Sequence, residues 1–366
     1  MNPPTWLYSG GWNTLCPGLR RKGSCSLYRG QDAASVIQVM TETNNSTCSH
    51  ISNFTLGGLP YLEDLNFWFG LFFLSMYMMA VLGNATLIYI IRVEQELHEP
   101  MYIFLFMLSV IELLIATAVM PQMLNIVWFA RKNISFDACL AQMFFLHFLS
   151  ALESGILVAM AVDRYMAICH PLRYTAILTH QNITKISLVN LARGLAVMIP
   201  IPLIIKRLPY WWSNRLTHSY CLHQDVMKLA CGDIRVNIIY GMFVIASIMG
   251  IDSLFISISY LLIIKEAVCL VKESSLKAIS TCAAHICAVL VYYIPLIGLS
   301  VMHRVPNGPI PNLHILFGNI YLLLPPVINP LIYGIKTKQI RNRLAKLFRK
   351  GKICKRKSRN KTSPGL

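Results

Sequence analysis

Two glutamates stand inside long apolar segments of the chain, Glu112 in the second such segment and Glu153 in the third. Ionisable side chains at membrane depth mark ion pathways or binding sites, and carboxylate oxygens are ligands that hard cations prefer. Together with Asn84, the two carboxylates predict a buried site for Na⁺ or another hard cation. The alternative is that one glutamate is protonated and shares a hydrogen bond with the other.

The sequence Asp163-Arg164-Tyr165 places a further charged group near the end of the third apolar segment. Arg164 lies 25 residues after Cys139, which is about 37 Å along a helix and reaches from one membrane face to the other. An Asp-Arg pair is costly in lipid, so it should face protein or water. Taken alone, the pair has an equally good alternative explanation: both side chains could simply extend to the membrane surface and have no functional role.

Proline and asparagine recur in the last apolar segment, which contains Pro325-Pro326-Val-Ile-Asn329-Pro330-Leu-Ile-Tyr333. Proline inside a membrane helix leaves a backbone carbonyl without its helical partner, and a nearby asparagine can donate to that carbonyl. An adjustable kink at this point suits a two-state element. We therefore expect one conformational switch made of Asp163, Arg164, Tyr165, Asn329, Pro330 and Tyr333.

Positioning such groups requires the apolar segments to be membrane helices. Hydrophobic residues make up 55% of the 366-residue chain and charged residues 13%, which is too apolar for a soluble domain. Crossing a hydrocarbon core of roughly 30 Å takes about 20 residues of helix. The expected fold is an all-α membrane protein, with seven membrane helices and a short amphipathic helix after the seventh. The seven segments are 67–91, 101–119, 139–168, 183–205, 236–264, 278–302 and 313–335.

Basic residues set the expected orientation. The segment 336–366 contains thirteen Lys or Arg and no Asp or Glu, a pattern typical of cytoplasmic segments that also attracts anionic lipid. The formal net charge of +17 is therefore assigned to membrane topology, and we expect no nucleic-acid partner. Seven crossings of the plasma membrane then place the N-terminus outside the cell. Glycosylation is expected before the first helix, at the sequons of Asn44, Asn45 and Asn53.

Three regions follow from this topology: an extracellular segment 1–66, a helix bundle 67–335 and a basic cytoplasmic tail 336–366. Residues 1–39 contain no apolar run suited to a signal peptide, and they precede a second methionine, Met40. We interpret residues 1–39 as a dispensable extension or the product of an upstream start.

Several motifs resemble those of the rhodopsin-like G-protein-coupled receptors over about 275 residues, and a finer set resembles the vertebrate odorant receptors. The resemblance implies a receptor for small odorants that activates a heterotrimeric G protein, the cyclase-stimulating type of olfactory neurons. It also implies that this switch couples to the G protein: the sixth helix moves outward at its inner end and exposes a crevice near Arg164, Ala278 and Tyr333. The wider motifs are Gly83-Asn84, Asp163-Arg164-Tyr165 and Asn329-Pro330; the finer ones are Pro100-Met101-Tyr102, Met160 to Cys169, Ser259-Tyr260, Lys277 to His285 and Tyr293-Ile294-Pro295.

Further stretches resemble class I, the fish-like odorant receptors, for which the resemblance implies water-soluble ligands such as carboxylic acids. These stretches are Leu208-Pro209-Tyr210, His218 to Cys231 and Pro295 to Arg304. One departure is Glu112, which stands where the family usually has aspartate.

The same resemblance implies a disulfide between Cys139 and Cys221, which ties the second outer loop over the bundle. Many odorant receptors carry a further cysteine earlier in this loop, where this chain has Trp211-Trp212. Cys231 is therefore either a free thiol or bonded to Cys48.

The expected ligand pocket lies in the outer half of the bundle. Ser300 and Arg304 are four residues apart at the outer end of the sixth helix, so they share one face. The planar guanidinium of arginine matches a carboxylate with two hydrogen bonds. With His147 of the third helix and His223 and Gln224 of the outer loop, they predict a site for a small aliphatic acid. The alternatives are a surface position for Arg304 and a hydrogen bond within the loop for His223.

Other functional classes have weaker support. The buried carboxylates would also suit a channel or transporter, but we find no repeat that relates two halves of the chain. The chain has no His-Glu-x-x-His or Gly-x-Ser-x-Gly motif, so we expect no enzymatic activity and no cofactor. The closest alternative is a receptor of the same family for an endogenous metabolite outside the nose.

Overall fold

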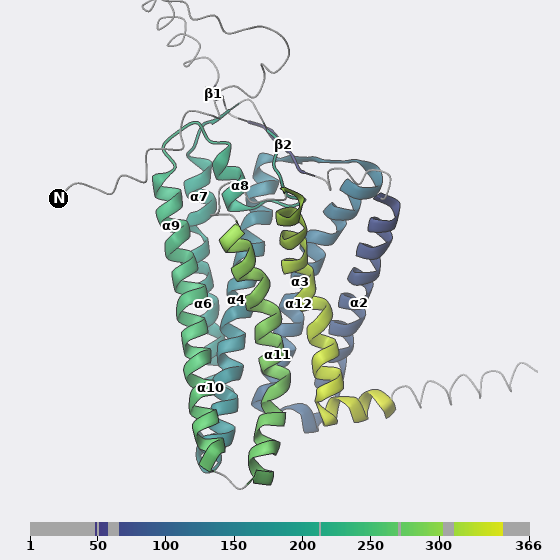
Figure 1. Cartoon of the computed structure of the whole chain (residues 1–366), viewed down its shortest axis with the longest axis vertical. Helices are drawn as coiled ribbons and strands as arrows, with labels where there is room; N and C mark the ends of the chain where they lie inside the picture. The colour runs from purple at the N-terminus through teal and green to yellow at the C-terminus, as the bar shows by residue number, and fades with distance from the viewer. Residues whose placement is uncertain are drawn as a thin grey trace, which may run out of the picture. The chain divides into compact units, whose positions relative to one another are not determined.

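Seven helical spans form a bundle in the computed structural model, which describes residues 48–49, 51–57, 66–211, 214–269, 272–302 and 311–346 (Figure 1). The fourth span is made of two consecutive helices, and the fifth is made of two α-helices joined by one turn of π-helix. The spans are α2 (Asn66–Val93), α3 (Pro100–Phe129), α4 (Phe136–Cys169), α6 with α7 (His180–Met198, Pro200–Lys206), α9 with η4 and α10 (Arg235–Ile245, Ala246–Gly250, Ile251–Cys269), α11 (Lys272–Met302) and α12 (Pro311–Lys336).

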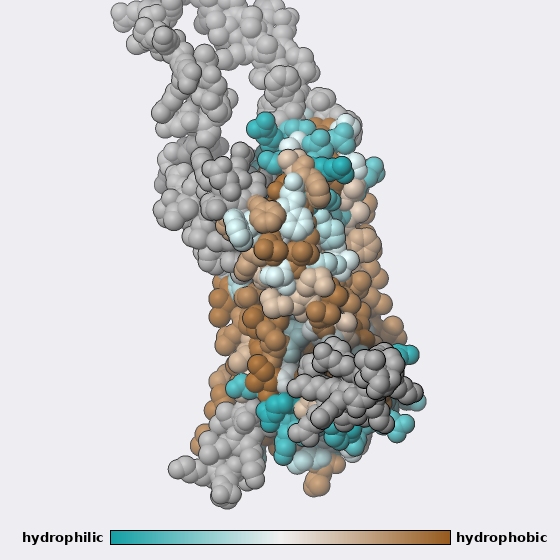
Figure 2. Space-filling model, turned by 90° about the vertical axis from the view of Figure 1, so that its right-hand side faces the viewer, coloured by the Kyte–Doolittle hydropathy of each residue, from teal (hydrophilic) through white to brown (hydrophobic). Residues whose placement is uncertain are grey.

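The outward faces of these helices are apolar. Six helices in the described part of the chain are long and apolar enough to cross a membrane, and α12 adds a seventh span of 26 residues. Phe67 and Trp68 of α2 are 64% and 65% exposed. Figure 2 shows apolar side chains along the length of the bundle and hydrophilic ones near its ends. Lipid is the solvent that such a surface needs, so the predicted all-α membrane bundle is confirmed.

Several helices extend past their predicted ends, among them α3 and α4. α3 runs through Pro121 to Phe129, ten residues beyond the predicted end, because neighbouring helices in a bundle compensate for the donor that proline lacks. α4 begins at Phe136, three residues early, because the Ser135 hydroxyl caps it by accepting a hydrogen bond from the Ala138 amide at 3.4 Å.

Short strands close one end of the bundle, which we call the Cys139 end. Phe54 is fully buried there, and its ring centroid lies 5.6 Å from that of Phe136 and 5.9 Å from that of Tyr210. This aromatic cluster anchors the segment before α2 to the start of α4 and to β4. The antiparallel pairs are β1 (Cys48–Ser49) with β4 (Tyr210–Trp211) and β2 (Asn53–Thr55) with β3 (Asn133–Ser135).

Disulfides fix the long loop at this end. The predicted bond between Cys139 and Cys221 is present. Cys231 is also disulfide-bonded, so the alternative that it is a free thiol is wrong. Its pairing with Cys48 stays a prediction.

The described bundle begins and ends one residue outside the predicted bounds of 67 and 335, at Asn66 and Lys336. Asn53, a predicted glycosylation site, is exposed in β2. The other two predicted sites, Asn44 and Asn45, and the segment 1–39 lie outside the described residues.

A short helix at 338–346 follows α12 at the opposite end of the bundle, which we call the Arg164 end (Figure 1). Ile340 is fully buried and Leu344 packs against the core, whereas most of the remaining side chains are exposed. Arg343 bridges to Glu94 at 3.0 Å and to Glu96 at 2.6 Å. The helix is therefore amphipathic, as predicted. Two short helices lie in neighbouring loops: η3 (Gln95–Leu97) and α5 (Pro171–Ile177).

Candidate functional site

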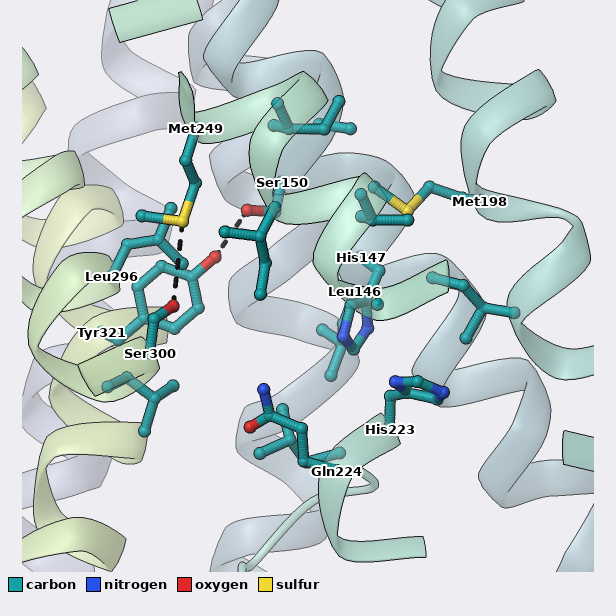
Figure 3. A pocket seen from close by; sticks show the side chains of 18 of the residues that line it. Leu146, His147, Ser150, Met198, His223, Gln224, Met249, Leu296, Ser300 and Tyr321 are labelled. Atoms are coloured by element: carbon teal, nitrogen blue, oxygen red, sulfur yellow. Dashed lines mark hydrogen bonds between the residues drawn. The ribbon is translucent and has the colours of Figure 1, made fainter. Parts of the chain in front are cut away.

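A cavity of about 330 Å³ lies in the Cys139 half of the bundle (Figure 3). Its walls come from α4, α6, α7, α9, η4, α11 and α12. The disulfide-tied loop 214–231, which we call the lid, covers it with the short helix α8 (His223–Lys228). A mainly apolar cavity of this size with a few polar groups is typical of small-molecule sites. The apolar lining includes Leu146, Met198, Ile201, Val244, Ile248, Met249 and Leu296, and the polar lining includes Ser150, Tyr220, Lys228, Asn237, Tyr292 and Tyr321.

The structure brings together four of the five residues predicted to bind the ligand. The four are His147, His223, Gln224 and Ser300. Arg304, the fifth, lies outside the described residues. The His147 Nδ1 lies 2.8 Å from the Met143 carbonyl; as the donor, it leaves Nε2 as an acceptor toward the cavity region.

His223 is buried within the lid, and its charge state limits what it can do. Burial, and then the nearby His147, lower the pKa of His223 to about 4. His223 is therefore neutral at pH 7 and supplies a hydrogen bond but no charge. An anionic ligand must take its positive charge from another residue. Lys228 of α8 lines the cavity, and Arg304 follows Ser300 by four positions in the sequence.

Asp225 holds the lid in shape from inside. Its Oδ2 accepts hydrogen bonds from the Thr217 hydroxyl at 2.6 Å, the His218 amide at 3.1 Å and His218 Nδ1. Burial raises the pKa of this carboxyl, but His218 and Thr217 lower it by more, so it lies below its usual value. Tyr220 extends the lid to α12 by donating to the Gly318 carbonyl at 3.1 Å. The lid is thus a fixed cover built on a buried carboxylate.

Three hydroxyl groups meet at the cavity wall, and those of Ser150 and Tyr321 lie on the opposite side from the lid residues His223 and Gln224 (Figure 3). Ser150 Oγ lies 2.5 Å from Tyr321 Oη and 2.9 Å from Tyr292 Oη. Tyr292 also donates to the Ser150 carbonyl at 2.8 Å. These bonds join α4, α11 and α12 at one point. We call Ser150, Tyr292 and Tyr321 the floor triad.

A second polar network lies one helical turn further along α4, toward the Arg164 end. Arg193 of α6 donates to both carboxylate oxygens of Asp252 in α10, at 2.5 and 3.0 Å. Ser154 donates to Asp252 at 2.6 Å and lies 2.9 Å from the Tyr293 hydroxyl. Tyr293 is two residues before Pro295, which removes one backbone hydrogen bond of α11. The network therefore connects four spans to the proline kink of α11.

Buried oxygen atoms without a hydrogen-bond donor in the described part of the chain occur in every residue of the predicted cation site. Asn329 Nδ2 donates to Glu112 Oε1 at 2.5 Å. One oxygen of each of Asn84, Glu112, Glu153 and Asn329 is buried and accepts no hydrogen bond from the described residues. Carboxylate and amide oxygens are the ligands of hard cations, so these residues fit the predicted Na⁺ site.

The proline kink of α12 is satisfied from a different helix. Asn84 Nδ2, in α2, donates to the Pro326 carbonyl at 2.9 Å. Gly83 permits this approach, because a Cβ at this position would lie 2.8 Å from the Pro330 Cβ. The asparagine next to the kink, Asn329, donates to Glu112 instead. The predicted asparagine–proline contact therefore exists between two spans and ties α2 to α12.

At the Arg164 end, the predicted switch arginine is paired with its neighbour. Arg164 Nε and Nη2 donate to Asp163 Oδ2 at 2.9 and 2.5 Å, and the Tyr174 hydroxyl donates to Asp163 Oδ1 at 2.8 Å. A cavity of about 20 Å³ lies between Arg164, His285 and Tyr333. These side chains from α4, α11 and α12 face a common space that separation of the helices would widen.

Tyr165 does not join this group. Its hydroxyl lies 3.1 Å from His170 Nε2 in a solvent-exposed contact. His285 instead forms a hydrogen bond to Tyr260 of α10. The side chain of Ala278, predicted to border the same crevice, lies outside the described residues.

Sequence reasoning missed the network of Arg193 and Asp252 and the floor triad. Arg193 and Asp252 carried a usable signal, since charged residues inside apolar segments are rare and usually paired. The floor triad carried none, because serine and tyrosine are ordinary residues of membrane helices. Only the packing of the spans shows that these three hydroxyls meet.

Comparison with known proteins assigns the chain to a family. A family model described as olfactory receptor matches residues 73–351. Human olfactory receptor 51E1 is 55% identical over 304 residues, which cover 83% of this chain and 96% of that protein. Mouse olfactory receptor 51E2 is 53% identical over 306 residues (83% and 96%), and human olfactory receptor 51D1 is 50% identical over 311 residues (84% and 96%). The chain belongs to the olfactory receptor family and is a multi-pass G-protein-coupled receptor of the plasma membrane, not an enzyme.

Proposed function

We propose that this olfactory receptor binds a small carboxylic acid in the cavity of about 330 Å³ and activates a cyclase-stimulating heterotrimeric G protein. The observation that carries the proposal is the gathering of His147, His223, Gln224 and Ser300 around one mainly apolar cavity. A carboxylate needs several donors, and an alkyl chain needs apolar walls; this cavity supplies both.

The charge of the acid is balanced at the lid side of the cavity. Arg304 is the proposed anchor, because it lies four residues after the cavity-lining Ser300 in the sequence. A guanidinium gives a carboxylate two parallel hydrogen bonds, which a single ammonium does not. Since His223 is neutral at pH 7, it assists as a hydrogen-bonding group.

The proposed topology has the Cys139 end outside the cell and the Arg164 end in the cytoplasm. It rests on the thirteen basic residues of 336–366 and is supported by the disulfide at the Cys139 end, since disulfides persist in oxidising surroundings. Odorants then reach the cavity from outside and the G protein meets Arg164 from inside.

Activation in this proposal is a shift between two arrangements of the bundle. The ligand binds the active arrangement more tightly and so increases its population. The floor triad and the network around Asp252 connect the cavity to α11, whose Pro295 kink is the element that moves. Outward movement of α11 would widen the small cavity at Arg164 for a helix of the G protein.

A cAMP assay in cells that express the receptor tests the proposal. Panels of aliphatic acids, alcohols and amines are compared on the wild type, on Arg304→Ala and on Arg235→Ala, a control whose guanidine is exposed outside the cavity. We expect acids alone to activate, and the half-maximal concentration to rise at least about tenfold in Arg304→Ala only, as loss of a charge-assisted bond of about 1.5–3 kcal/mol requires. Equal acid responses in all three receptors would exclude the anchor.

A further inference from the structure

The cavity has polar groups at two separate places with apolar walls between them. His223 and Gln224 stand on the lid side, Ser150 and Tyr321 of the floor triad stand on the other, and Ser300 of α11 contacts Met249 of η4. Figure 3 shows the Ser150 and Tyr321 hydroxyls joined to each other and set apart from Gln224 and His223. A simple alkyl acid bound by its carboxylate at the lid would place its methyl terminus against hydroxyl oxygens. Such a ligand leaves one polar surface of the cavity unmatched.

The hydrogen count of the floor triad determines what it can bind. Each hydroxyl has one hydrogen and two lone pairs. Tyr292 uses its hydrogen on the Ser150 carbonyl, and the contacts of Ser150 with Tyr292 and Tyr321 use the other two. All three donors are then committed, whereas the Tyr321 oxygen keeps its lone pairs. The floor therefore accepts a hydrogen bond from a ligand hydroxyl and disfavours a second carboxylate.

The length of α11 that lines the cavity sets the length of the ligand. Tyr292 and Ser300, which both line the cavity, are eight residues apart on α11, about 12 Å along the helix. An extended chain covers about 3.5 Å with three bonds, so the span takes about ten bonds. The volume agrees: about 330 Å³ is roughly twice a cavity of about 150 Å³ that holds benzene.

We propose that the receptor prefers a medium-chain acid of about eight to ten carbons with a hydroxyl at the end remote from the carboxylate. Its carboxylate lies under the lid and its hydroxyl donates to Tyr321 of the floor triad. Met198, Ile201 and Ile248 contact the chain between them. This inference rests on the proposed acid-binding function and adds a second recognition point to it.

The test compares nonanoic acid with omega-hydroxynonanoic acid, which differ by one hydroxyl. Their half-maximal concentrations are measured by cAMP in cells, and their binding is measured by the rise in the unfolding temperature of the purified full-length receptor. We expect the hydroxy acid to be about five- to tenfold more potent on the wild type, as one added hydrogen bond supplies. In Tyr321→Phe, which removes the accepting oxygen, the ratio should fall to about one.

Tyr240→Phe is the matched control, because its hydroxyl donates to the Val197 carbonyl at 2.8 Å and it does not line the cavity. It should keep the wild-type ratio. Equal potency of the two acids on the wild type, or a preference that survives in Tyr321→Phe, overturns the inference while the acid-binding function stands. If neither acid stabilises or activates the receptor, the proposed function fails first and the inference fails with it.

Discussion

The guanidinium of Arg193 and the carboxylate of Asp252 form a two-point ion pair between the fourth and fifth spans, with nitrogen–oxygen distances of 2.5 and 3.0 Å. Asp252 is buried, whereas the Arg193 side chain is 29% exposed. Ser154 donates to Asp252 and also contacts the Tyr293 hydroxyl. The ion pair therefore holds in place the groups that contact α11 next to its kink. Its integrity should matter both for folding and for signalling.

Removing one partner of this pair should destabilise the receptor more than removing both. Asp252→Leu leaves the Arg193 charge without its partner, and the expected loss is about 3 kcal/mol, at the low end for buried pairs because Arg193 is partly exposed. Arg193→Leu together with Asp252→Leu should recover part of it. Unfolding temperature in detergent measures the effect; additive losses in the double variant would show that the two charges do not interact.

The buried oxygens around Glu112 predict that Na⁺ modulates the receptor. Replacing Na⁺ in the medium by a large organic cation should shift the half-maximal acid concentration by about five- to 150-fold, the usual range of allosteric coupling. Glu112→Gln should remove this dependence, whereas Asp137→Asn, an exposed carboxylate at the Cys139 end, should keep it. Identical sodium dependence in wild type and Glu112→Gln would place the cation elsewhere.

The lowered pKa of His223 predicts that a decrease in pH destabilises the folded receptor. The pKa of this histidine is about 4 in the folded receptor and about 6.5 in an unfolded chain, so between these values the unfolded chain binds a proton that the folded one does not. Stability therefore falls as pH falls, by about 2 kcal/mol from pH 7 to pH 5. The unfolding temperature should drop over this range, and His223→Asn should drop less. His180→Asn, an exposed histidine in α6, is the control and should follow the wild type.

Gly318 predicts a steric limit where the lid meets α12. A Cβ at this position would lie 2.9 Å from the His218 ring and 3.0 Å from the Tyr220 hydroxyl, so Gly318→Ala must displace the lid. We expect reduced surface expression and at least a tenfold loss in acid potency. Gly250→Ala, where nothing lies within 4 Å of the added atom, should behave like the wild type. Unchanged potency in Gly318→Ala would mean that the lid position does not control the ligand.

The helix bundle was predictable from local chemistry, and part of the site from the family resemblance. The lengths of the apolar segments predict the membrane spans, and the basic tail predicts which end of the bundle faces the cytoplasm. Neither prediction requires knowledge of how the spans pack. His147, His223, Gln224 and Ser300 were singled out mainly from the resemblance to class I odorant receptors, and the structure places all four around one cavity.

The pairing of residues across spans was not predictable in the same way. Ser150 and Tyr321 are 171 positions apart, and their contact depends on the rotation of α4 and α12 about their axes. Apolar residues surround a membrane helix on all faces, so periodicity does not report that rotation. The rotation of the helices also decides that Asn84 of α2, and not the adjacent Asn329, donates to the Pro326 carbonyl at the α12 kink. This choice was therefore not predictable from the sequence either.

The strand Asn53–Thr55 precedes the first span, yet its partners come much later in the chain. The Thr55 amide donates to the Asn214 carbonyl at 2.8 Å, and the strand pairs with Asn133–Ser135. During synthesis, the chain must therefore deliver two spans before the strand meets its first partner, and four before it meets its second. The strand layer at the Cys139 end is thus completed late, and a chain halted midway through insertion carries this strand with its hydrogen-bonding edges unpaired.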